Sequence, residues 1–302
     1  MRSSRAAKPA ICSYENSPYR TAFWPGREYE DQAERIALRH MLPERGARLC
    51  DIGAGFGRLA DEYHGYEQVI LLDYSWSMLR DAVRRLHRDP RFVFVAADLY
   101  NLPFADSALD TAVTVRVLHH VVDVPRAFAE VNRVVSPQGA YITEFANKRH
   151  LKARVRRWWT GRPPDLDSLE PSEYLKLHFD FHPRFITEQL RVGGFDVRDK
   201  RAVSDFRLAA LKRVFPARLL SGLDGLLQRP LAGLDLTPSI FMRSQSAKPG
   251  EPVINQALWR CLRCGSTEFE TSSEALTCRA CSRTYPILEG VIDFRESRQT
   301  GT

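Results

Sequence analysis

Asp51-Ile52-Gly53-Ala54-Gly55-Phe56-Gly57 is the stretch of sequence that decides the fold. The residues before it, from Arg48 on, form a short apolar run that predicts a buried strand breaking into the glycines. Glycine allows a tight backbone turn and a close approach of the backbone to a ligand. The stretch therefore predicts a strand that ends in a ligand-binding turn.

Outward from this turn, strand and helix patterns alternate along the chain. We expect seven strands, at residues 48–55, 68–75, 91–98, 109–120, 139–145, 195–200 and 239–245. We expect helices at residues 31–42, 56–65, 77–89, 124–139, 182–194 and within 207–236. Such alternation predicts an α/β fold with a doubly wound, mainly parallel, Rossmann-like sheet.

Two further acidic residues accompany the glycine turn. Asp73 ends the second predicted strand, where a carboxylate can accept hydrogen bonds from both ribose hydroxyls. Asp98 ends the third, where it could accept a hydrogen bond from an adenine amino group. The glycines follow a GxGxG pattern with Arg58 behind it, rather than GxGxxG, which makes a poor phosphate cradle. A nicotinamide enzyme and a turn without any ligand are therefore the weaker interpretations.

The run DIGAGFGR, LLDYSWSML, VAADLYNLPF, LDTAVTVRVLHHV and EVNRVVSPQGAYITEF resembles the class I S-adenosylmethionine (SAM)-dependent methyltransferases, in particular their UbiE-like branch. The resemblance covers residues 46–147 well and extends more loosely to residue 244. It implies a seven-stranded methyltransferase sheet, with the glycine loop around the methionine part of SAM. It also implies a set of cofactor-binding residues: Asp51, Gly53, Gly55, Gly57, Asp73, Tyr74, Met78, Asp98, Leu99 and Arg116.

Candidate catalytic residues follow the fourth and fifth predicted strands. His119 and His120 come at the end of the fourth strand, and an imidazole can act as a general base near neutral pH. A structural interpretation is that one histidine contacts the cofactor and the other caps the next helix. Adjacent histidines are expected to point in divergent directions, which argues against a metal site. Glu144, at the end of the fifth strand, is a second candidate for contact with the methyl acceptor.

Two segments outside the alternating pattern are rich in aromatic or basic residues. Tyr14, Tyr19, Phe23 and Trp24 form either a lid over the pocket or part of the core. Six of the ten residues 148–157 are Lys or Arg, and apolar residues recur beside them at helical spacing. A helix over 148–159 could contact an anionic surface such as a membrane or a phosphate backbone, or cover the active site. It could equally be a solvated helix whose tryptophans join the core.

Four of the six cysteines lie close together near the C-terminus, in two CxxC units separated by 13 residues. Each unit can present two thiolates, and four thiolates suit a tetrahedral zinc ion. This spacing predicts a zinc site formed by Cys261, Cys264, Cys278 and Cys281. The following TYPILEGVIDF is similar to the zinc ribbons of the small methyltransferase-activator family, which implies a supporting or regulatory ribbon fused in cis.

These features predict an order of segments along the chain. A lid segment (1–45) precedes the methyltransferase domain (46–246), which carries substrate-side insertions at 148–182 and 207–236. A linker (247–256) leads to the small β zinc ribbon (257–302).

Composition and charge narrow the function classes. The chain has no apolar run long enough to span a membrane and no secretory signal pattern, so we expect a cytoplasmic protein. A formal net charge of +7 is compatible with anionic partners. The sequence predicts methyl transfer from SAM to a small molecule, with RNA as a second class of acceptor. The alternative is a non-catalytic SAM- and zinc-binding partner of another methyltransferase or of the translation machinery.

Overall fold

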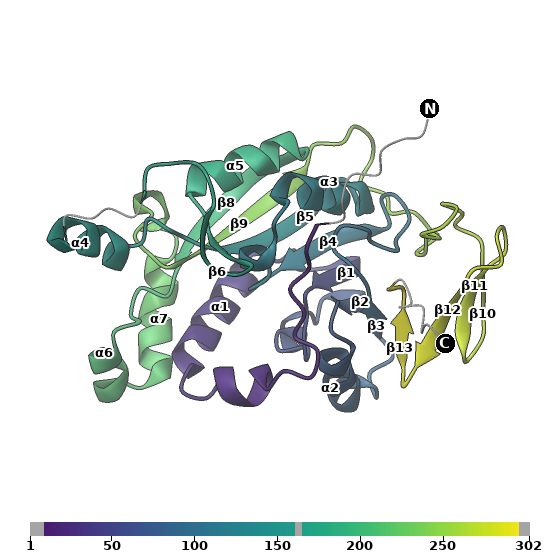
Figure 1. Ribbon diagram of the computed structural model, residues 1–302, viewed down its shortest axis with the longest axis horizontal. Coiled ribbons are helices and arrows are strands. Elements are labelled where there is room, and N and C mark those ends of the chain that lie inside the picture. The colour runs from purple at the N-terminus through teal and green to yellow at the C-terminus, as the bar shows by residue number, and fades with distance from the viewer. Residues whose placement is uncertain (1–8, 161–164, 296–302) are drawn as a thin grey trace.

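The computed structural model describes residues 9–160 and 165–295. Its central sheet has seven strands in the order β3-β2-β1-β4-β5-β9-β8 (Figure 1). The first five strands in the chain are parallel, while β9 is antiparallel to both β5 and β8. The predicted doubly wound, Rossmann-like sheet is therefore confirmed. The strand bounds are β1 (Gly46–Ile52), β2 (Tyr66–Asp73), β3 (Phe92–Ala96), β4 (Leu109–Thr114), β5 (Val135–Ala146), β8 (Phe195–Val203) and β9 (Ser239–Ser246).

Helices cover both faces of this sheet because its inner strands are apolar on both sides. Successive side chains of a strand point to opposite faces. In β1, Leu49 packs with α1 (Glu28–Met41), α2 (Trp76–Leu86) and α7 (Ala217–Leu227). Its neighbour Cys50 packs with the opposite layer, formed by α3 (Val124–Val134) and α5 (Pro183–Val192).

Two predicted helices are wrong in extent. Residues 56–65 form turns and a single 3-10 helix (Ala60–Glu62) instead of an α-helix. Gly57 has a φ of +73°, which a right-handed helix cannot accommodate. The helix expected at 124–139 ends at Val134, and β5 begins at the next residue. Pro137 would clash with the preceding turn of a helix, so the chain forms a bulged strand there.

The two insertions fold beside the carboxyl ends of the strands. The first contains α4 (Leu151–Thr160) and a hairpin of β6 (Ser172–Leu175) and β7 (His178–Asp180). The second contains α6 (Ala209–Val214), α7 and a 3-10 turn at Ala232–Leu234. None of the helices in the described ranges is both long and apolar enough to cross a bilayer.

The cysteine-bearing ribbon continues the central sheet. It consists of β10 (Phe269–Thr271), β11 (Ala275–Cys278), β12 (Thr284–Leu288) and β13 (Val291–Asp293), and β13 pairs in parallel with β3. The result is one eleven-stranded sheet with the ribbon at its edge (Figure 1). The sequence suggested a ribbon that packs on the methyltransferase, and main-chain pairing between the two was not expected. The predicted segment boundaries themselves stay predictions.

An aromatic cluster supports this junction. Phe294 is buried and lies 4.3 Å from Tyr285 and 5.3 Å from Trp259, measured between ring centroids. Its backbone N–H donates to the carbonyl of Ala96 at 2.8 Å. Trp259 in turn packs against Phe104 of the main domain.

We expect Phe294→Ala to lower the free energy of unfolding of the whole chain by about 3 kcal/mol, because it removes a buried ring at the junction. Urea unfolding followed by far-UV circular dichroism and tryptophan fluorescence measures this. Leu288→Ala, at a half-exposed position in the same ribbon, is the matched control and should cost far less. A separate ribbon transition that leaves the main transition unchanged would contradict the expectation.

Candidate functional site

A large cavity lies at the carboxyl ends of the parallel strands, where the chain order reverses between β1 and β4. Ligands of open α/β sheets bind at this switch point. The cavity volume is about 1080 Å³, including solvent at its mouth. Nine of the ten predicted cofactor residues line it: Asp51, Gly53, Gly55, Asp73, Tyr74, Met78, Asp98, Leu99 and Arg116. Gly57 lies outside the lining and packs against Leu71 and Leu86.

The glycine turn forms the floor of the cavity. Gly53 has a φ of +80°, and a Cβ at this position would lie 2.2 Å from a methyl group of Val117. Gly55 has a φ of +55°, and its N–H donates to Oδ2 of Asp73 at 2.8 Å. Residues with a side chain rarely adopt such backbone angles. Position 53 therefore requires glycine, because a side chain would also clash with Val117, and position 55 favours it. The turn leaves its backbone accessible to a ligand.

Asp73 is held by main-chain donors at the end of β2. Its Oδ1 accepts from the N–H of Ser75 at 2.7 Å, while Oδ2 accepts from Gly55. Burial raises the pKa of this carboxyl, and the backbone hydrogen bonds oppose the rise. The side chain is therefore fixed in direction before any ligand arrives.

Asp51, at the end of β1, is the second buried acid of the cavity. The hydroxyl of Tyr63 donates to its Oδ2 at 2.8 Å. Burial raises the pKa of Asp51 to about 7, and the Tyr63 hydrogen bond only partly offsets this. A cation placed beside Asp51 would favour its ionised form.

Asp98 and Leu99 follow β3 on the far side of the cavity. Oδ1 of Asp98 accepts from the N–H of Tyr100 at 2.9 Å, which orients the carboxylate. Met78 of α2 and Leu99 line the same cavity and give it apolar walls. This part of the cavity therefore offers an acceptor group between apolar side chains.

Arg116, just after β4, is tied to α1 through Glu34. Its Nη2 and Nε donate to the two carboxylate oxygens of Glu34 at 2.5 and 3.2 Å. Arg58, after the glycine turn, donates to the same carboxylate at 2.8 Å. Both guanidinium groups lie over the ring of Trp24, at 4.1 Å for Arg58 and 5.0 Å for Arg116. These contacts hold the aromatic N-terminal segment at the cavity.

The four aromatic residues of that segment do not all face the cavity. Tyr14, Tyr19 and Trp24 line it. Phe23 stacks on Tyr19 at 4.9 Å and lies under the guanidinium of Arg27. The positions of Tyr14, Tyr19 and Trp24 fit a lid over the cavity, whereas Phe23 packs against Tyr19 and Arg27.

His120 lines the cavity, and His119 lies next to it outside the lining. Their ring centroids are 4.0 Å apart, so the expectation that they diverge is wrong. The helix cap predicted for one of them is formed instead by Asp123, which accepts from the N–H of Arg126. The reason is that residues 118–120 form a 3-10 turn, which keeps both rings on one side of the chain.

The partners of His120 fix its tautomer. Its Nδ1 lies 2.9 Å from the carbonyl oxygen of Leu177, which can only accept, so Nδ1 carries the proton. Nε2 then accepts from the hydroxyl of Tyr14 at 2.9 Å. Burial lowers the pKa of His120. It lowers the pKa of His119 much further, with the neighbouring His120 and Arg116 adding to the effect. Both rings are therefore neutral near pH 7.

Sequence reasoning missed a third histidine, His178 of β7. Its ring centroid lies 4.5 Å from that of His120 and 6.2 Å from that of His119. Tyr174 of β6 lies 6.0 Å from His178. No motif marks these residues. Only the position of the hairpin within a predicted substrate-side insertion pointed to them.

Glu144, at the end of β5, is buried and engaged by protein donors. Oε1 accepts from the hydroxyl of Ser239 at 2.5 Å, and Oε2 accepts from the N–H of Arg116 at 2.9 Å. It does not line the cavity. These bonds favour a role in holding Arg116 in its left-handed conformation, with a φ of +60°. The predicted contact of Glu144 with an acceptor stays a prediction.

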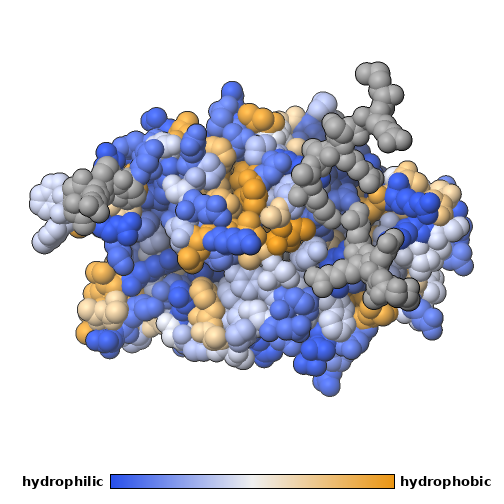
Figure 2. Space-filling view, viewed as in Figure 1, coloured by the Kyte–Doolittle hydropathy of each residue, from blue (hydrophilic) through white to orange (hydrophobic). Residues whose placement is uncertain are grey.

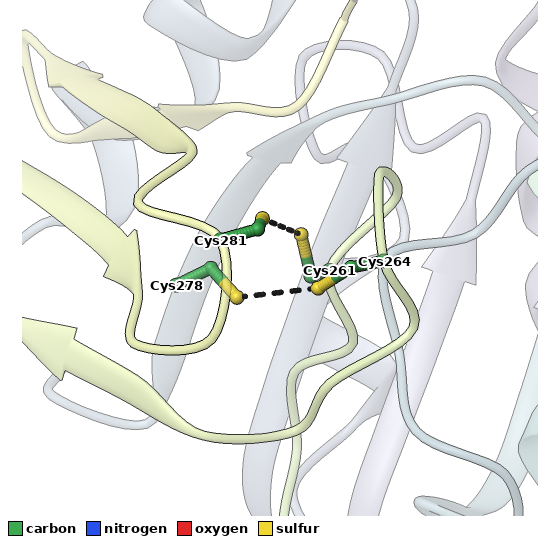
Figure 3. Close-up of side chains that lie close together, drawn as sticks. All are labelled: Cys261, Cys264, Cys278 and Cys281. Carbon is green, nitrogen blue, oxygen red and sulfur yellow. Dashed lines mark hydrogen bonds between the residues drawn. The ribbon is translucent and has the colours of Figure 1, made fainter.

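The four C-terminal cysteines form a compact cluster (Figure 3). Their sulfur atoms all lie within 4.8 Å of one another, and Cys261–Cys281 and Cys264–Cys278 are each 3.6 Å apart. Tetrahedral zinc with bonds of about 2.3 Å places its sulfur ligands at nearly this spacing. The side chains could therefore hold a zinc ion.

Comparison with known proteins identifies the central segment. Residues 50–143 match the family model described as a methyltransferase domain. The chain is similar to demethylmenaquinone methyltransferase of Roseiflexus sp., at 34% identity over 139 residues, 44% of this chain and 57% of that protein. It is also similar to 2-phytyl-1,4-naphtoquinone methyltransferase of Trichormus variabilis, at 28% identity over 42% of this chain and 58% of that protein. The chain thus spans little more than half the length of these curated relatives.

Solved structures share the fold. The complex between the Haloferax volcanii Trm112 methyltransferase activator and the putative methyltransferase superposes with a TM-score of 0.54 at 16% identity. The match covers 79% of this chain and 97% of that one. At this identity the superposition shows that the α/β fold is shared. The assignment of the C-terminal segment as a zinc ribbon rests on its cysteine cluster and on strands β10–β13.

Proposed function

We propose that this protein transfers a methyl group from SAM to a small quinol-type acceptor. One observation carries the proposal. Three carboxylates, Asp51, Asp73 and Asp98, end three neighbouring strands and line one cavity around the glycine turn. The cavity offers partners of the right chemistry to the amino group, the ribose hydroxyls and the adenine amino group of an adenosyl amino acid.

The residues present fit SAM part by part. Asp73, oriented by Gly55 and Ser75, is placed to accept from the two ribose hydroxyls. Asp98 would accept from the adenine amino group between Met78 and Leu99. Asp51 would pair with the methionine ammonium. When bound, SAM supplies a methyl group already activated by its sulfonium, so the protein needs mainly to align the acceptor and exclude water.

The acceptor side of the cavity suits a flat, hydroxylated ring. Tyr14, Tyr19 and Trp24 give it aromatic walls. The relatives named above act, by their names, on demethylmenaquinone and 2-phytyl-1,4-naphthoquinone. A reduced quinone of this kind is an electron-rich ring whose hydroxyl must lose a proton before or during attack on the methyl group.

His119 is our candidate for the base that accepts this proton. Burial beside His120 and Arg116 lowers its pKa well below the usual value, so the imidazole is neutral near pH 7 and would act as a weak base. Nε2 of His120 already accepts from Tyr14, which favours a positioning role for His120. In the transfer, the acceptor gains a bond to the methyl carbon and loses a proton, while the carbon–sulfur electrons stay on sulfur to give S-adenosylhomocysteine (SAH).

We also propose that the cysteine cluster binds one zinc ion and supports the cofactor site. The ribbon residue Arg295 donates to the carbonyl of Tyr74 at 3.1 Å, and its guanidinium lies 3.6 Å from Glu15. Glu15 in turn accepts from the first N–H groups of α2, those of Trp76 and Ser77. Together with the β13–β3 pairing, these contacts connect the ribbon to the residues that flank Asp73.

The affinity for SAH should rise with pH through about pH 7. Below that pH, Asp51 is protonated in the free protein and must ionise to pair with the ligand ammonium, so affinity falls by up to about tenfold per pH unit. Calorimetric titration with SAH between pH 5.5 and 8.5 measures this. Asp51→Asn should bind weakly and without the pH dependence, whereas exposed Asp61→Asn should behave as wild type. Failure of the wild-type protein to bind SAH or SAM at any pH would refute the cofactor assignment.

His119→Gln should lower kcat for methyl transfer by about 10² or more while changing SAH affinity less than threefold, because it removes the proton acceptor. The assay follows labelled methyl from SAM into a prenylated naphthoquinol kept reduced under argon. Exposed His87→Gln is the matched control. Label entering RNA in place of the quinol would reject the small-molecule acceptor. SAH binding without label in any acceptor would favour the non-catalytic alternative.

Purified protein should contain one zinc per chain, measured by emission spectrometry. Cys278→Ser should lose the metal and weaken SAH binding, because four thiolates complete the site and the ribbon residue Arg295 contacts Tyr74, which lines the cavity. Buried Cys50→Ser, outside the cluster, controls for loss of a thiol. Full SAH affinity in a zinc-free protein would reject the supporting role of the ribbon.

A further inference from the structure

Exposed apolar side chains are concentrated at one end of the molecule. Among the described residues, eighteen large apolar side chains are exposed, and eleven of them lie on α4, α6, α7 and the turns beside them. These helices occupy the same end in Figure 1, and Figure 2 shows apolar side chains over α6 and α7 there. We call this region the terminal surface. Its apolar members are Leu151, Val155, Trp158, Trp159, Leu208, Val214, Phe215, Leu219, Leu223, Leu226 and Leu234.

The two tryptophans of α4 point into solvent. Trp158 is 84% exposed and Trp159 is 79% exposed, so neither belongs to the core. The alternative interpretation, in which these two tryptophans pack in the core, is therefore wrong. The helix itself is anchored, because Arg154 donates to the carbonyl of Leu234 at 3.2 Å. The N–H of Leu151 donates to the carbonyl of Leu236 at 2.8 Å.

The helix α7 is apolar on the side that faces solvent as well as on the side that faces the core. Leu220 is buried in the cluster formed with α1, at the inner face of α7. Leu219, Leu223 and Leu226 recur at helical spacing on the other side and are exposed. A helix that only needs solubility carries polar residues at such positions. Within the part of the chain that the structure describes, this second apolar face belongs to neither hydrophobic core cluster.

Cations without acidic partners accompany these side chains. Among the described residues, Lys152, Arg213, Arg218 and Arg229 form no ion pair within 4.0 Å. The one acid within α7, Asp224, is buried and accepts from the hydroxyl of Tyr29. The terminal surface therefore has an unbalanced positive charge around its apolar residues.

We propose that the terminal surface docks on an anionic phospholipid bilayer. Tryptophan favours the boundary between headgroups and acyl chains, and leucine and phenylalanine side chains insert below it. Arginine and lysine can lie along the same boundary with their charges at the phosphates. A nucleic acid would use the cations and aromatic rings but has no use for a row of exposed leucines. The proposal does not rest on the proposed function, since it concerns a surface outside the cofactor cavity.

Flotation of the full-length, zinc-loaded protein with phosphatidylcholine vesicles, with and without phosphatidylglycerol, tests docking at near-physiological salt. We expect binding only to the anionic vesicles. Trp158→Ser/Trp159→Ser should weaken the partition coefficient about tenfold. Arg213→Gln/Arg218→Gln/Arg229→Gln should weaken it by about fivefold per cation. Tryptophan fluorescence should shift to the blue on binding, and the shift should be lost in the first variant.

Control variants outside the terminal surface distinguish docking through this surface from non-specific attraction of anionic vesicles to a basic protein. Val192→Ser/Leu288→Ser and Arg45→Gln/Arg88→Gln remove exposed residues of the same kinds outside the terminal surface. They should bind as wild type, and all variants should keep the SAH-induced thermal shift if the cofactor assignment holds. The proposal is overturned if wild type ignores anionic vesicles or if the terminal-surface variants bind like the controls. Wild-type binding to single-stranded RNA, lost in these variants while vesicle binding is absent, would also overturn it.

Discussion

A buried carboxylate, that of Glu34, connects the parts of the molecule that must meet at the cavity. It is 1% exposed and accepts from Arg58 and Arg116, which follow the glycine turn and β4 respectively. Burial disfavours its charge, but the two guanidinium groups hold its pKa below the usual value. Removing one partner from a buried charge cluster leaves an uncompensated charge and is strongly destabilising. The two guanidinium groups also lie over the ring of Trp24. The positions of α1, of the glycine turn, of the end of β4 and of the aromatic N-terminal segment therefore depend on one another.

The side of the cavity where we propose that the cofactor binds and the side proposed for the acceptor are constructed differently. On the cofactor side, backbone N–H groups orient the carboxylates of Asp73 and Asp98, so these groups are pre-organised. On the side where we propose that the acceptor binds, Tyr14 and His120 line the cavity, and His119 and the β6–β7 hairpin pack next to His120. A common cofactor requires a rigid site, whereas side chains on loops and insertions can vary with the acceptor.

The ribbon extends the sheet next to the strand that precedes Asp98. Parallel pairing of β13 with β3 covers what would otherwise be an open edge of the central sheet. A ribbon of this size buries too little apolar surface to fold unaided, so metal binding would contribute to the stability of the shared sheet. Loss of the metal would then destabilise the pairing of β13 with β3 and, with it, the position of Asp98 in the cavity.

The sequence by itself determined the succession of strands and helices, the glycine turn and the three acids near the carboxyl ends of β1, β2 and β3. These depend on local constraints: apolar periodicity, positive φ at Gly53 and Gly55, and the fixed polarity of parallel strands. It also determined the cysteine cluster, because the spacing of the four cysteines along the sequence is enough to predict that they form one site. Local pattern failed at residues 56–65 and at Pro137, where turn geometry overrode apolar periodicity.

Only the tertiary structure decided which side chains share a surface across long sequence separations. It brought Tyr14 to His120, His178 to both earlier histidines, Glu34 to two arginines and β13 to β3. It also showed that Glu144 is satisfied by Ser239 and that Trp158 and Trp159 face solvent. Such contacts depend on how loops and insertions pack against the sheet, and no periodicity in a single sequence encodes that packing.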